Sequence, residues 1–314
     1  MLFAGAMLVA MAVDAALGWP DRLYDRIGHP VTWLGALIER AEARLNLTAD
    51  PFWKRRLKGV VVCLGVTALA WSVAQLVVWV LPGGLWGAVL TGVFAWPLVA
   101  GRSLHDHVRR VARPLARRDL QGARDAVAMI VGRDPALLDS PGVARAALES
   151  LAENASDGVV APLFWGVIFG LPGIAAYKAI NTMDSMIGHM SPRYRAFGWA
   201  AARLDDLVNL VPARLTALLF IAVAGMRWKV ALKVMVADAG HHRSPNAGWP
   251  EAAMAGALDV RLSGPRVYDG ALSSEPWVNA GAADPDPMDL GRGLNLYLAA
   301  MLALAGLMAL VAVI

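Results

Sequence analysis

The pattern of hydrophobic and polar positions divides the chain into apolar runs separated by polar connections. A transmembrane helix needs about 20 mostly apolar residues. Four clean runs are of roughly this kind, and two more are interrupted by proline, glycine or a charged residue. The clean runs cover residues 1–17, 59–81, 85–100 and 294–314, and the interrupted runs cover 159–176 and 208–226. Because no convincing alternation of period two predicts strands, the sequence indicates an all-α, polytopic helical membrane protein.

The interrupted runs predict broken or re-entrant helices. Residues 159–176 contain Pro162, Gly170 and Pro172, which break the helical hydrogen-bond ladder or its regular backbone. Such backbone is tolerated at membrane depth only where protein or water satisfies the freed polar groups. We therefore expect this segment to bend so that its polar continuation, up to residue 190, returns to the cytoplasmic side.

The polar connections add helices outside the membrane. Segment 101–157 is expected to be a cytoplasmic helical insert, and its last helix is expected to begin with Ser140 as N-cap and to end at Gly158. The three helices of this insert are predicted near 102–118, 119–131 and 141–157. Segment 260–293 is rich in proline, glycine and aspartate, which predicts a mobile loop. Since no internal repeat is visible, residues 1–314 are expected to form a single membrane domain.

Composition and charge agree with this assignment. With 57% hydrophobic residues, 17% charged residues and a mean hydropathy of +0.49, the chain lies outside the range of soluble globular domains. Lysine and arginine concentrate in residues 18–58 and 101–157, which by the positive-inside rule places both segments in the cytoplasm. The formal charge of +4 therefore requires no nucleic-acid partner, and the expected surroundings are a lipid bilayer.

Three carboxylates at helical spacing form the first candidate site. Glu149, Glu153 and Asp157 are predicted to share one helix face with Arg145. Each adjacent carboxylate pair should destabilise the helix by about 0.2–0.5 kcal/mol. A divalent cation, or a polyphosphate bound through one, would offset this cost, because Mg²⁺ prefers acidic oxygens. The alternative is a solvated face on which Arg145 pairs with Glu149.

A second polar cluster interrupts apolar surroundings. Lys178, Asn181, Asp184 and Ser185 fall within two helical turns. Asparagine, aspartate and serine supply hard oxygen ligands that suit Mg²⁺, and a lysine ammonium suits a phosphate. The competing interpretation is a structural ion pair between Lys178 and Asp184.

A third cluster contains two adjacent aspartates. Arg203, Asp205, Asp206 and Asn209 precede the second interrupted run. Neighbouring positions on a helix point in different directions, so at most one of Asp205 and Asp206 is expected to face a common site. The other carboxylate is expected to pair with an arginine.

A fourth cluster surrounds a predicted helix start. Ser244, Asn246 and Glu251 lie around Pro250, which suits the first turn of a helix. They form either a capped loop or an anion site built from side chains and backbone N–H groups. His29 is a weaker candidate that could equally be a loop contact. Neither a P-loop nor a dinucleotide fingerprint occurs, so a nucleotide would be held without those motifs.

Several strings of residues, read together, carry a family resemblance. They are Val131-Gly132-Arg133-Asp134, Glu149-Ser150-Leu151-Ala152-Glu153-Asn154, Asp157-Gly158, Asn181-Thr182-Met183-Asp184-Ser185-Met186, Arg203-Leu204-Asp205-Asp206 and Ser244-Pro245-Asn246-Ala247-Gly248-Trp249-Pro250-Glu251. In this order, the strings closely resemble the CobD/CbiB family of cobalamin biosynthesis, the membrane-bound adenosylcobinamide-phosphate synthases. The resemblance extends from Asp14 to about Gly270.

This resemblance implies an enzyme of the bacterial inner membrane with its active site facing the cytoplasm. The implied reaction is an ATP-dependent C–N ligation that joins adenosylcobyric acid, a corrinoid, to (R)-1-amino-2-propanol or its phosphate. Mg²⁺ is the implied cofactor, ATP is a substrate, and a homo-oligomer or a complex with late-pathway enzymes is an expected assembly.

Roles for the four clusters follow from combining this resemblance with the chemistry of the residues. The expected metal ligands are Glu153, Asp157 and Asp184. The expected catalytic residues are Glu149, Glu153, Lys178, Asp184 and Arg203, with Lys178 and Arg203 stabilising phosphate charge and either Glu149 or Glu251 acting as general base. The expected substrate- and nucleotide-binding residues are His29, Asn154, Asn181, Ser185, Asp206, Ser244, Asn246 and Glu251.

Two other classes of protein remain alternatives at this point. A Mg²⁺-dependent membrane prenyltransferase or alcohol-phosphatidyltransferase also gathers Asn and Asp at the membrane face, although Gly188 stands where a further Asp would be expected. A transporter also carries charged residues and broken helices within the membrane. ATP consumption that depends on a corrinoid acid would separate these three functions.

Overall fold

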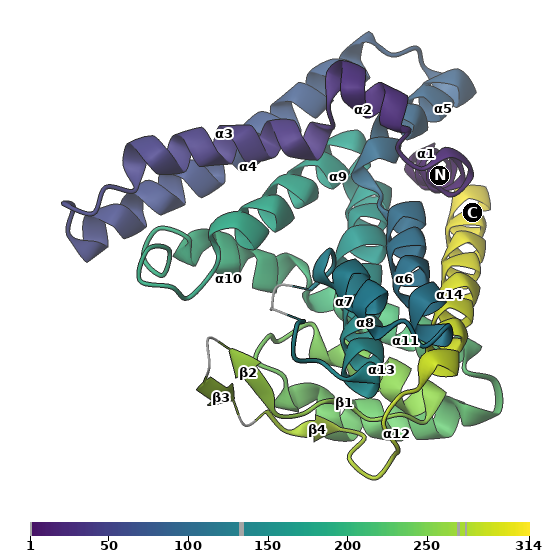
Figure 1. Ribbon diagram of the computed structural model, residues 1–314. Coiled ribbons are helices and arrows are strands. Elements are labelled where there is room, and N and C mark those ends of the chain that lie inside the picture. The colour runs from purple at the N-terminus through teal and green to yellow at the C-terminus, as the bar shows by residue number, and fades with distance from the viewer. Residues whose placement is uncertain (1, 132–134, 269–270, 274) are drawn as a thin grey trace. The chain divides into compact units, whose positions relative to one another are not determined.

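The computed structural model describes residues 2–131, 135–268, 271–273 and 275–314. Contacts within the chain divide it into two compact units. Unit 1 comprises Met1–Ala100, Ala161–Asn209 and Leu307–Ile314, and unit 2 comprises Gly101–Val160 and Leu210–Gly306. The structure is overwhelmingly helical (Figure 1), so the predicted all-α fold class is confirmed.

The helices of unit 1 follow the apolar runs of the sequence. They are α1 (Leu2–Leu17), α2 (Asp21–Ile27), α3 (Pro30–Leu45), α4 (Phe52–Val80), α5 (Gly84–Ala95), the 3₁₀ turn η1 (Trp96–Leu98), α9 (Ala161–Ile187) and α10 (Trp199–Val208). Helix α3 lies beside α4, and both pack on α9 (Figure 1). Their shared core includes Ile38, Val62, Met183 and Phe197, all nearly inaccessible to solvent.

Two glycines allow backbone segments of unit 1 to touch. A Cβ at Gly59 of α4 would overlap the Phe197 carbonyl oxygen, and one at Gly198 would overlap the Ile187 carbonyl oxygen. These contacts hold the 188–198 connection against α4 and the end of α9, so the start of α10 is closely fixed.

Membrane crossing is supported by helix length and composition. Four helical segments are long and apolar enough to span a bilayer, and two bent helix pairs raise the number to as many as six. The four segments are Phe52–Val80, Gly84–Ala116, Ser140–Ile187 and Pro287–Val313, and the bent pairs are Leu2–Leu17 with Asp21–Leu45 and Trp199–Val208 with Leu210–Val223. Each of the six predicted runs overlaps one of these segments or pairs, and the protein is a multi-pass membrane protein.

Helix α9 is broken where the sequence predicts a break. Gly170 has φ 67° and ψ −152°, a backbone conformation that lies outside the helix and strongly favours glycine. Pro172 follows two residues later and cannot donate a hydrogen bond to the preceding turn. The two halves of α9 therefore change direction at Gly170.

The boundaries of the carboxylate helix differ from the prediction. Helix α8 (Ser140–Ala155) does not stop at Gly158 but continues through the π-helical segment η2 (Ser156–Val160) towards α9. Its N-cap is Asp139, whose side chain accepts a hydrogen bond from the Gly142 N–H at 2.8 Å, and Ser140 is already helical. The predicted N-cap is wrong by one residue, because Asp and Ser are equally good N-caps. The predicted C-terminus is wrong because Gly158 is buried within the π-helical segment and does not end the helix.

Unit 2 surrounds one buried helix. Every residue of helix α13 (Gly248–Leu258) except Trp249 is buried, with α8, α11 and α12 packed against it. The other elements of the unit are α6 (Gly101–Ala116), α7 (Leu120–Ala128), α11 (Leu210–Val223), η3 (Gly225–Arg227), α12 (Trp228–Asp238), η4 (Ala239–His241) and α14 (Pro287–Val313) up to Gly306. Small residues make this burial possible, since α13 is mostly alanine and glycine.

The segment predicted as a loop contains short strands that the sequence did not predict. They are β1 (Leu262–Ser263), β2 (Arg266–Tyr268), β3 (Ala271–Ser273) and β4 (Trp277–Val278). β1 pairs antiparallel with β4, and β2 pairs antiparallel with β3. Strands of two or three residues are too short to produce a visible period-two pattern. Helix α14 also begins at Pro287, earlier than the predicted end of the loop. Residues 269–270 and 274, and the Gly132–Asp134 part of the sequence motif, lie outside the described residues.

The orientation of the broken helix can be tested by cysteine labelling. A cysteine at Ser191, exposed beyond the end of α9, is expected to react with an impermeant maleimide from the cytoplasmic side only. Cys63 is buried and should give little background. A cysteine at Gly83, in the turn between α4 and α5, is the matched control and should react from the opposite side. Exclusively periplasmic reaction at position 191 would contradict the predicted return to the cytoplasm.

Candidate functional site

A buried hydrogen-bond network joins α9 to α10 within unit 1. The Tyr177 hydroxyl donates to Asn209 Oδ1 at 2.9 Å, and Asn209 Nδ2 donates to Asp205 Oδ2 at 3.0 Å. Asn181 Nδ2 approaches the other oxygen, Asp205 Oδ1, at 3.4 Å. Asp205 is 8% exposed and Asn209 is 1% exposed. Two side-chain amides therefore hold a carboxylate that has little access to water.

Two further carboxylates lie within electrostatic range of Asp205. Asp184 interacts with both Asp205 and Asp206. One oxygen of Asp184 lies so close to Gly188 that a Cβ there would overlap it, and the Asp184 carbonyl accepts a hydrogen bond from the Gly188 N–H at 2.7 Å. Because like charges repel one another, this group of three carboxylates favours a bound cation or a proton.

One basic side chain pairs with a member of this carboxylate group. Arg203 pairs with Asp206 at 3.1 Å and remains largely exposed. Lys178 lies on the same helix as Asp184 and is close enough to His29 to interact with it electrostatically. Unit 1 therefore brings Arg203 to the carboxylates through its pair with Asp206, whereas Lys178 lies near His29 and its predicted role beside Asp184 stays a prediction.

His29 and Ser185 have clear structural roles. His29 Nδ1 accepts a hydrogen bond from the Val31 N–H at 3.1 Å and so caps α3, while its ring packs edge-on against Trp19 at 4.8 Å between centroids. The Ser185 hydroxyl donates to the Asn181 carbonyl at 2.9 Å. These contacts agree with the loop-contact interpretation of His29, and its role in binding stays a prediction.

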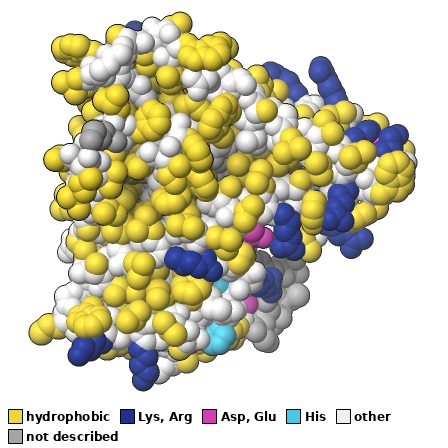
Figure 2. Space-filling model, turned by 180° about the vertical axis from the view of Figure 1, so that it is seen from behind, with side chains coloured by type: hydrophobic (Ala, Val, Ile, Leu, Met, Phe, Trp, Pro, Cys, Tyr) yellow, Lys and Arg dark blue, Asp and Glu magenta, His cyan; other side chains and the backbone are white. Residues whose placement is uncertain are grey.

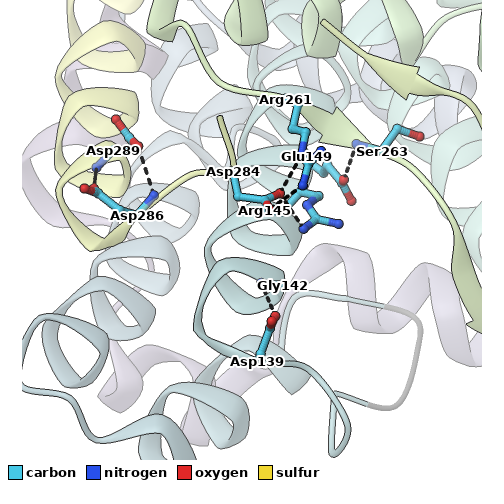
Figure 3. Close-up of polar contacts among 9 residues, drawn as sticks. All are labelled: Asp139, Gly142, Arg145, Glu149, Arg261, Ser263, Asp284, Asp286 and Asp289. Carbon is cyan, nitrogen blue, oxygen red and sulfur yellow. Dashed lines mark hydrogen bonds and ion pairs between the residues drawn. The ribbon is translucent and has the colours of Figure 1, made fainter. Parts of the chain in front are cut away.

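In unit 2, Glu149 makes a buried hydrogen bond to the backbone of β1. It is 6% exposed, and its Oε1 accepts a hydrogen bond from the Ser263 N–H of β1 at 2.7 Å (Figure 3). Ser263 has φ 60°, which is strained for a residue with a side chain. The carboxylate of Glu149 therefore helps to hold an unfavourable backbone conformation, a role that helical spacing does not reveal.

Arg145 forms its salt bridge with a residue far along the chain. Its Nη2 lies 2.8 Å from Asp284 Oδ1, and Arg261 pairs with both oxygens of the same carboxylate (Figure 3). Both guanidinium groups also face the ring of Trp277, at 4.6 and 4.3 Å from its centroid. The shared Asp284 and Trp277 tie α8 to the strand segment and to the connection before α14.

The other members of the carboxylate stripe lie in different environments. Glu153 and Asn154 are exposed, and Asn154 Nδ2 donates to the Ser150 carbonyl at 2.9 Å. Asp157 is partly buried in η2, and π-helical turns occur frequently at functional sites. Its neighbour Ser156 is 1% exposed, and its hydroxyl has no hydrogen-bond partner within the described residues.

No preformed metal ligand set is present in the described part of the chain. No group of three or more His, Cys, Asp or Glu side chains gathers closely enough to hold a metal ion among residues 2–131, 135–268, 271–273 and 275–314. Glu153 and Asp157 belong to unit 2, whereas Asp184 belongs to unit 1. Their predicted joint role as ligands therefore stays a prediction.

The loop before α13 has the geometry of a capped turn. The Ser244 hydroxyl accepts hydrogen bonds from the N–H groups of Asn246 and Ala247 at 3.2 and 3.3 Å. Asn246 is 5% exposed and Glu251 is 2% exposed, with a carboxylate oxygen 3.9 Å from His242 Nε2. The capped-loop interpretation therefore explains Ser244. The buried Glu251 carboxylate beside the His242 imidazole is also a candidate proton acceptor.

The Asp284 network predicts a dependence of stability on pH. The hydrogen bond from Arg261, with the positive charges of Arg145 and Arg261, holds the pKa of Asp284 below its ordinary value of 3.8 although burial opposes the shift. A depressed pKa contributes stability that is fully present above the unfolded-state pKa and is lost as the pH falls through the folded-state pKa. We therefore expect wild type to unfold at a higher temperature than Asp284→Asn at neutral pH, with the difference shrinking below about pH 4.

Thermal unfolding in detergent over this pH range measures the effect. Asp125→Asn, which alters an exposed carboxylate of α7 that accepts a hydrogen bond from Gln121, is the matched control. A stability difference for Asp284→Asn that stayed constant into the acid range would contradict the role given to this ion pair.

Asp205, Asn209 and Tyr177 are members of the unit 1 network that the sequence-based site did not include. The sequence indicates that at most one of two adjacent aspartates faces a common site, and the site predicted from the sequence contains Asp206. In the structure, Asp205 is the buried member and Asp206 pairs with Arg203 nearer the surface. Asp206 nevertheless stays within electrostatic range of Asp184.

Comparisons with known proteins agree with the resemblance seen in the sequence. Residues 7–297 match the family model described as CobD/Cbib protein. A cobalamin biosynthesis protein CobD from Rhodobacter capsulatus is 61% identical over 314 residues, which cover 100% of this chain and 99% of that protein. Proteins of the same name from Sinorhizobium fredii and Brucella suis are 48% and 45% identical, each covering 95% of this chain and 94% of the relative. No solved structure matches. The matches span nearly the whole chain, which therefore belongs to the CobD/CbiB family of cobalamin biosynthesis.

Proposed function

We propose that this protein catalyses the ATP-dependent formation of an amide bond between adenosylcobyric acid and (R)-1-amino-2-propanol or its phosphate. Membership of a cobalamin biosynthesis family supports the pathway. The observation that carries the chemistry is the group of carboxylates in unit 1, where Asp184 interacts electrostatically with both Asp205 and Asp206 and Arg203 pairs with Asp206. Such a combination suits a magnesium nucleotide.

The reaction needs activation because a carboxylate is a poor electrophile. In the proposed sequence, the carboxylate of the corrinoid acid takes the terminal phosphoryl group of ATP, which forms an acyl phosphate and releases ADP. The amine then attacks the acyl carbon, a C–N bond forms, and phosphate leaves with loss of a proton from nitrogen. Both steps move negative charge, so binding and electrostatic stabilisation are the main tasks of the protein.

The residues present fit a magnesium ion that is held partly by substrate. Mg²⁺ usually keeps several waters and binds through one or two carboxylates together with phosphate oxygens, so a triad of acidic ligands is not required. Asp184 and the amide-supported Asp205 supply such oxygens, and Glu153 and Asp157 are additional proposed ligands. When bound, the ion would neutralise charge on the transferring phosphoryl group.

The remaining side chains are assigned by charge and exposure. Arg203 would stabilise phosphate oxygens, because it presents N–H donors beside Asp206, and Lys178 is proposed for the same task because its ammonium suits a phosphate. Between the two candidate bases, the surroundings favour Glu251 near His242, since Glu149 already accepts a backbone hydrogen bond. The proposed contacts to substrate and nucleotide are made by His29, Asn154, Asn181, Ser185, Asp206, Ser244, Asn246 and Glu251.

Location follows from the substrates. Because ATP is cytosolic, we propose that the active site of this inner-membrane protein faces the cytoplasm, with α9 broken at Gly170 so that Asp184 reaches that side. A homo-oligomer or a complex with other enzymes of the pathway is compatible with this location.

A reconstituted assay tests the proposal. Purified protein in detergent, Mg·ATP, adenosylcobyric acid and either amine should yield a product with the mass of the amide, together with ATP consumption that depends on the corrinoid acid. Omitting each substrate in turn is the control. ATP turnover independent of the corrinoid acid, or product formation from a polyprenyl or lipid substrate instead, would contradict the proposal and favour the alternative classes.

A further inference from the structure

Helix α12 presents an apolar stripe to the exterior of unit 2. Trp228, Leu232 and Val236 are spaced four residues apart and therefore share one face of the helix. Their side chains are 46%, 36% and 70% exposed. A contiguous exposed apolar strip of this kind marks an interaction surface.

Packing against α13 fixes which face of α12 points outward. Ala231, Val234 and Met235 are buried on the opposite side. A Cβ at Gly256 of α13 would lie 2.6 Å from the Ala231 Cα, so the two helices touch at this point. This close approach fixes the rotation of α12 about its own axis. The apolar stripe therefore faces the exterior of unit 2.

A basic stripe runs beside the apolar one. Lys229 and Lys233 are both exposed and are also spaced by one helical turn. Within the described residues, neither lysine forms an ion pair, and Lys229 Nζ lies 5.5 Å from the centroid of the Trp228 ring. Asp238, the nearest acidic residue along the chain, accepts a hydrogen bond from the Asn279 N–H, and Asp259 pairs with Arg227.

The position of α12 along the chain places it beside a membrane helix. Helix α11 forms part of a candidate span and ends at Val223. The chain then turns at Gly225, which has φ 57°, and α12 begins at Trp228. At the lower end of the face shown in Figure 2, where α12 lies in Figure 1, hydrophobic and basic side chains occur together.

We propose that α12 lies in the membrane interface and binds anionic phospholipid head groups. An apolar stripe flanked by lysines, with tryptophan at one end, is the pattern of an interfacial amphipathic helix. Tryptophan is enriched at headgroup depth, and lysine side chains extend towards anionic phosphates. The positive charge of Lys229 and Lys233 selects anionic over zwitterionic lipid. This inference concerns a surface outside the proposed active site and does not rest on the proposed ligation.

The experiment places a fluorescent probe on the exposed stripe of the full-length protein. In a Cys63→Ala background, Val236→Cys is labelled with an environment-sensitive nitrobenzoxadiazole dye and reconstituted into nanodiscs. Lipids that carry a doxyl quencher near the head group or deep in the acyl chain report depth. Quenchers on phosphatidylglycerol or on phosphatidylcholine, at equal mole fraction, report selectivity.

The proposal leads to four expectations. The shallow quencher should act more strongly than the deep one, and labelled phosphatidylglycerol should quench roughly two-fold or more strongly than labelled phosphatidylcholine. The double variant Lys229→Gln, Lys233→Gln should remove this excess while the probe stays at the same depth. The matched variant Lys229→Arg, Lys233→Arg keeps the charge and should retain the excess.

Several outcomes would overturn the proposal. A probe that no lipid quenches would show that α12 does not touch the bilayer, and stronger deep quenching would show a spanning helix instead. An excess for phosphatidylglycerol that survives the glutamine variant would exclude Lys229 and Lys233 as its source. Disulfide formation between two copies at position 236 would identify the surface as an interface between protein chains.

Discussion

Replacing Asp184 by asparagine is expected to lower the rate of amide formation by a factor on the order of 10² to 10³, the usual cost of losing one preorganised electrostatic contact in an active site. Asparagine has the same shape but cannot carry the negative charge that a magnesium ion requires. Because the substituted residue still fits beside Gly188 and α9 ends at Ile187, the fold should be retained. Product formation by the purified variant, together with thermal unfolding in the same detergent, measures both effects.

Two further variants separate charge from position. Gly188→Ala keeps the Asp184 carboxylate but adds a Cβ where one of its oxygens now lies, so it should displace the carboxylate and lower activity. Asp50→Asn removes a carboxylate of the same unit that pairs with Lys54 and Lys58 outside the proposed site, and it should leave activity nearly unchanged. Full activity of Asp184→Asn would remove this residue from the proposed metal site.

Replacing Glu149 by alanine is expected to lower the free energy of unfolding by about 1–3 kcal/mol, because the buried Ser263 N–H would lose its acceptor. The strained backbone of Ser263, with φ 60°, would also lose the contact that helps to hold it. Denaturation in detergent, followed by a probe of helical structure, measures the change. This effect is one of stability, whereas the sequence alone suggested a role for Glu149 in catalysis.

Glutamine and a neighbouring carboxylate provide the controls. Glu149→Gln keeps an oxygen that can accept the hydrogen bond from the Ser263 N–H and should recover most of the stability. If this variant is stable but inactive, Glu149 has a role in proton transfer. Glu153→Ala alters an exposed carboxylate one turn further along α8 and should change stability little. A Glu149→Ala protein as stable as wild type would contradict the structural role.

The buried aspartate of the pair on α10 illustrates a limit of reading a sequence. Asp205 and Asp206 are chemically identical neighbours, and helical geometry states only that they point in different directions. The packing of α10 against α9 decides that Asp205 meets Asn181, in addition to its local contact with Asn209 four residues later. The choice of Asp206 from the sequence therefore could not have been improved without tertiary contacts.

Arg145 shows the same limit over a longer distance. Helical spacing offers Glu149 as its partner four residues away, but the structure provides Asp284, which is 139 residues away. Such pairs depend on where a loop returns in space, which local propensity does not encode. The short strands β1 to β4 exist for the same reason, because each is defined by its partner.

The sequence by itself determined the candidate membrane-spanning segments, the all-helical class, a break within residues 159–176 and the family. These properties depend on the length of apolar runs, on backbone restrictions of glycine and proline, and on residue order, all of which are local. Only the tertiary structure decided that Glu149 supports β1, that Asp205 is the buried carboxylate, and that α12 turns an apolar and basic face outward. Each of these depends on which atoms of distant segments come within hydrogen-bond or van der Waals distance, and packing alone sets those distances.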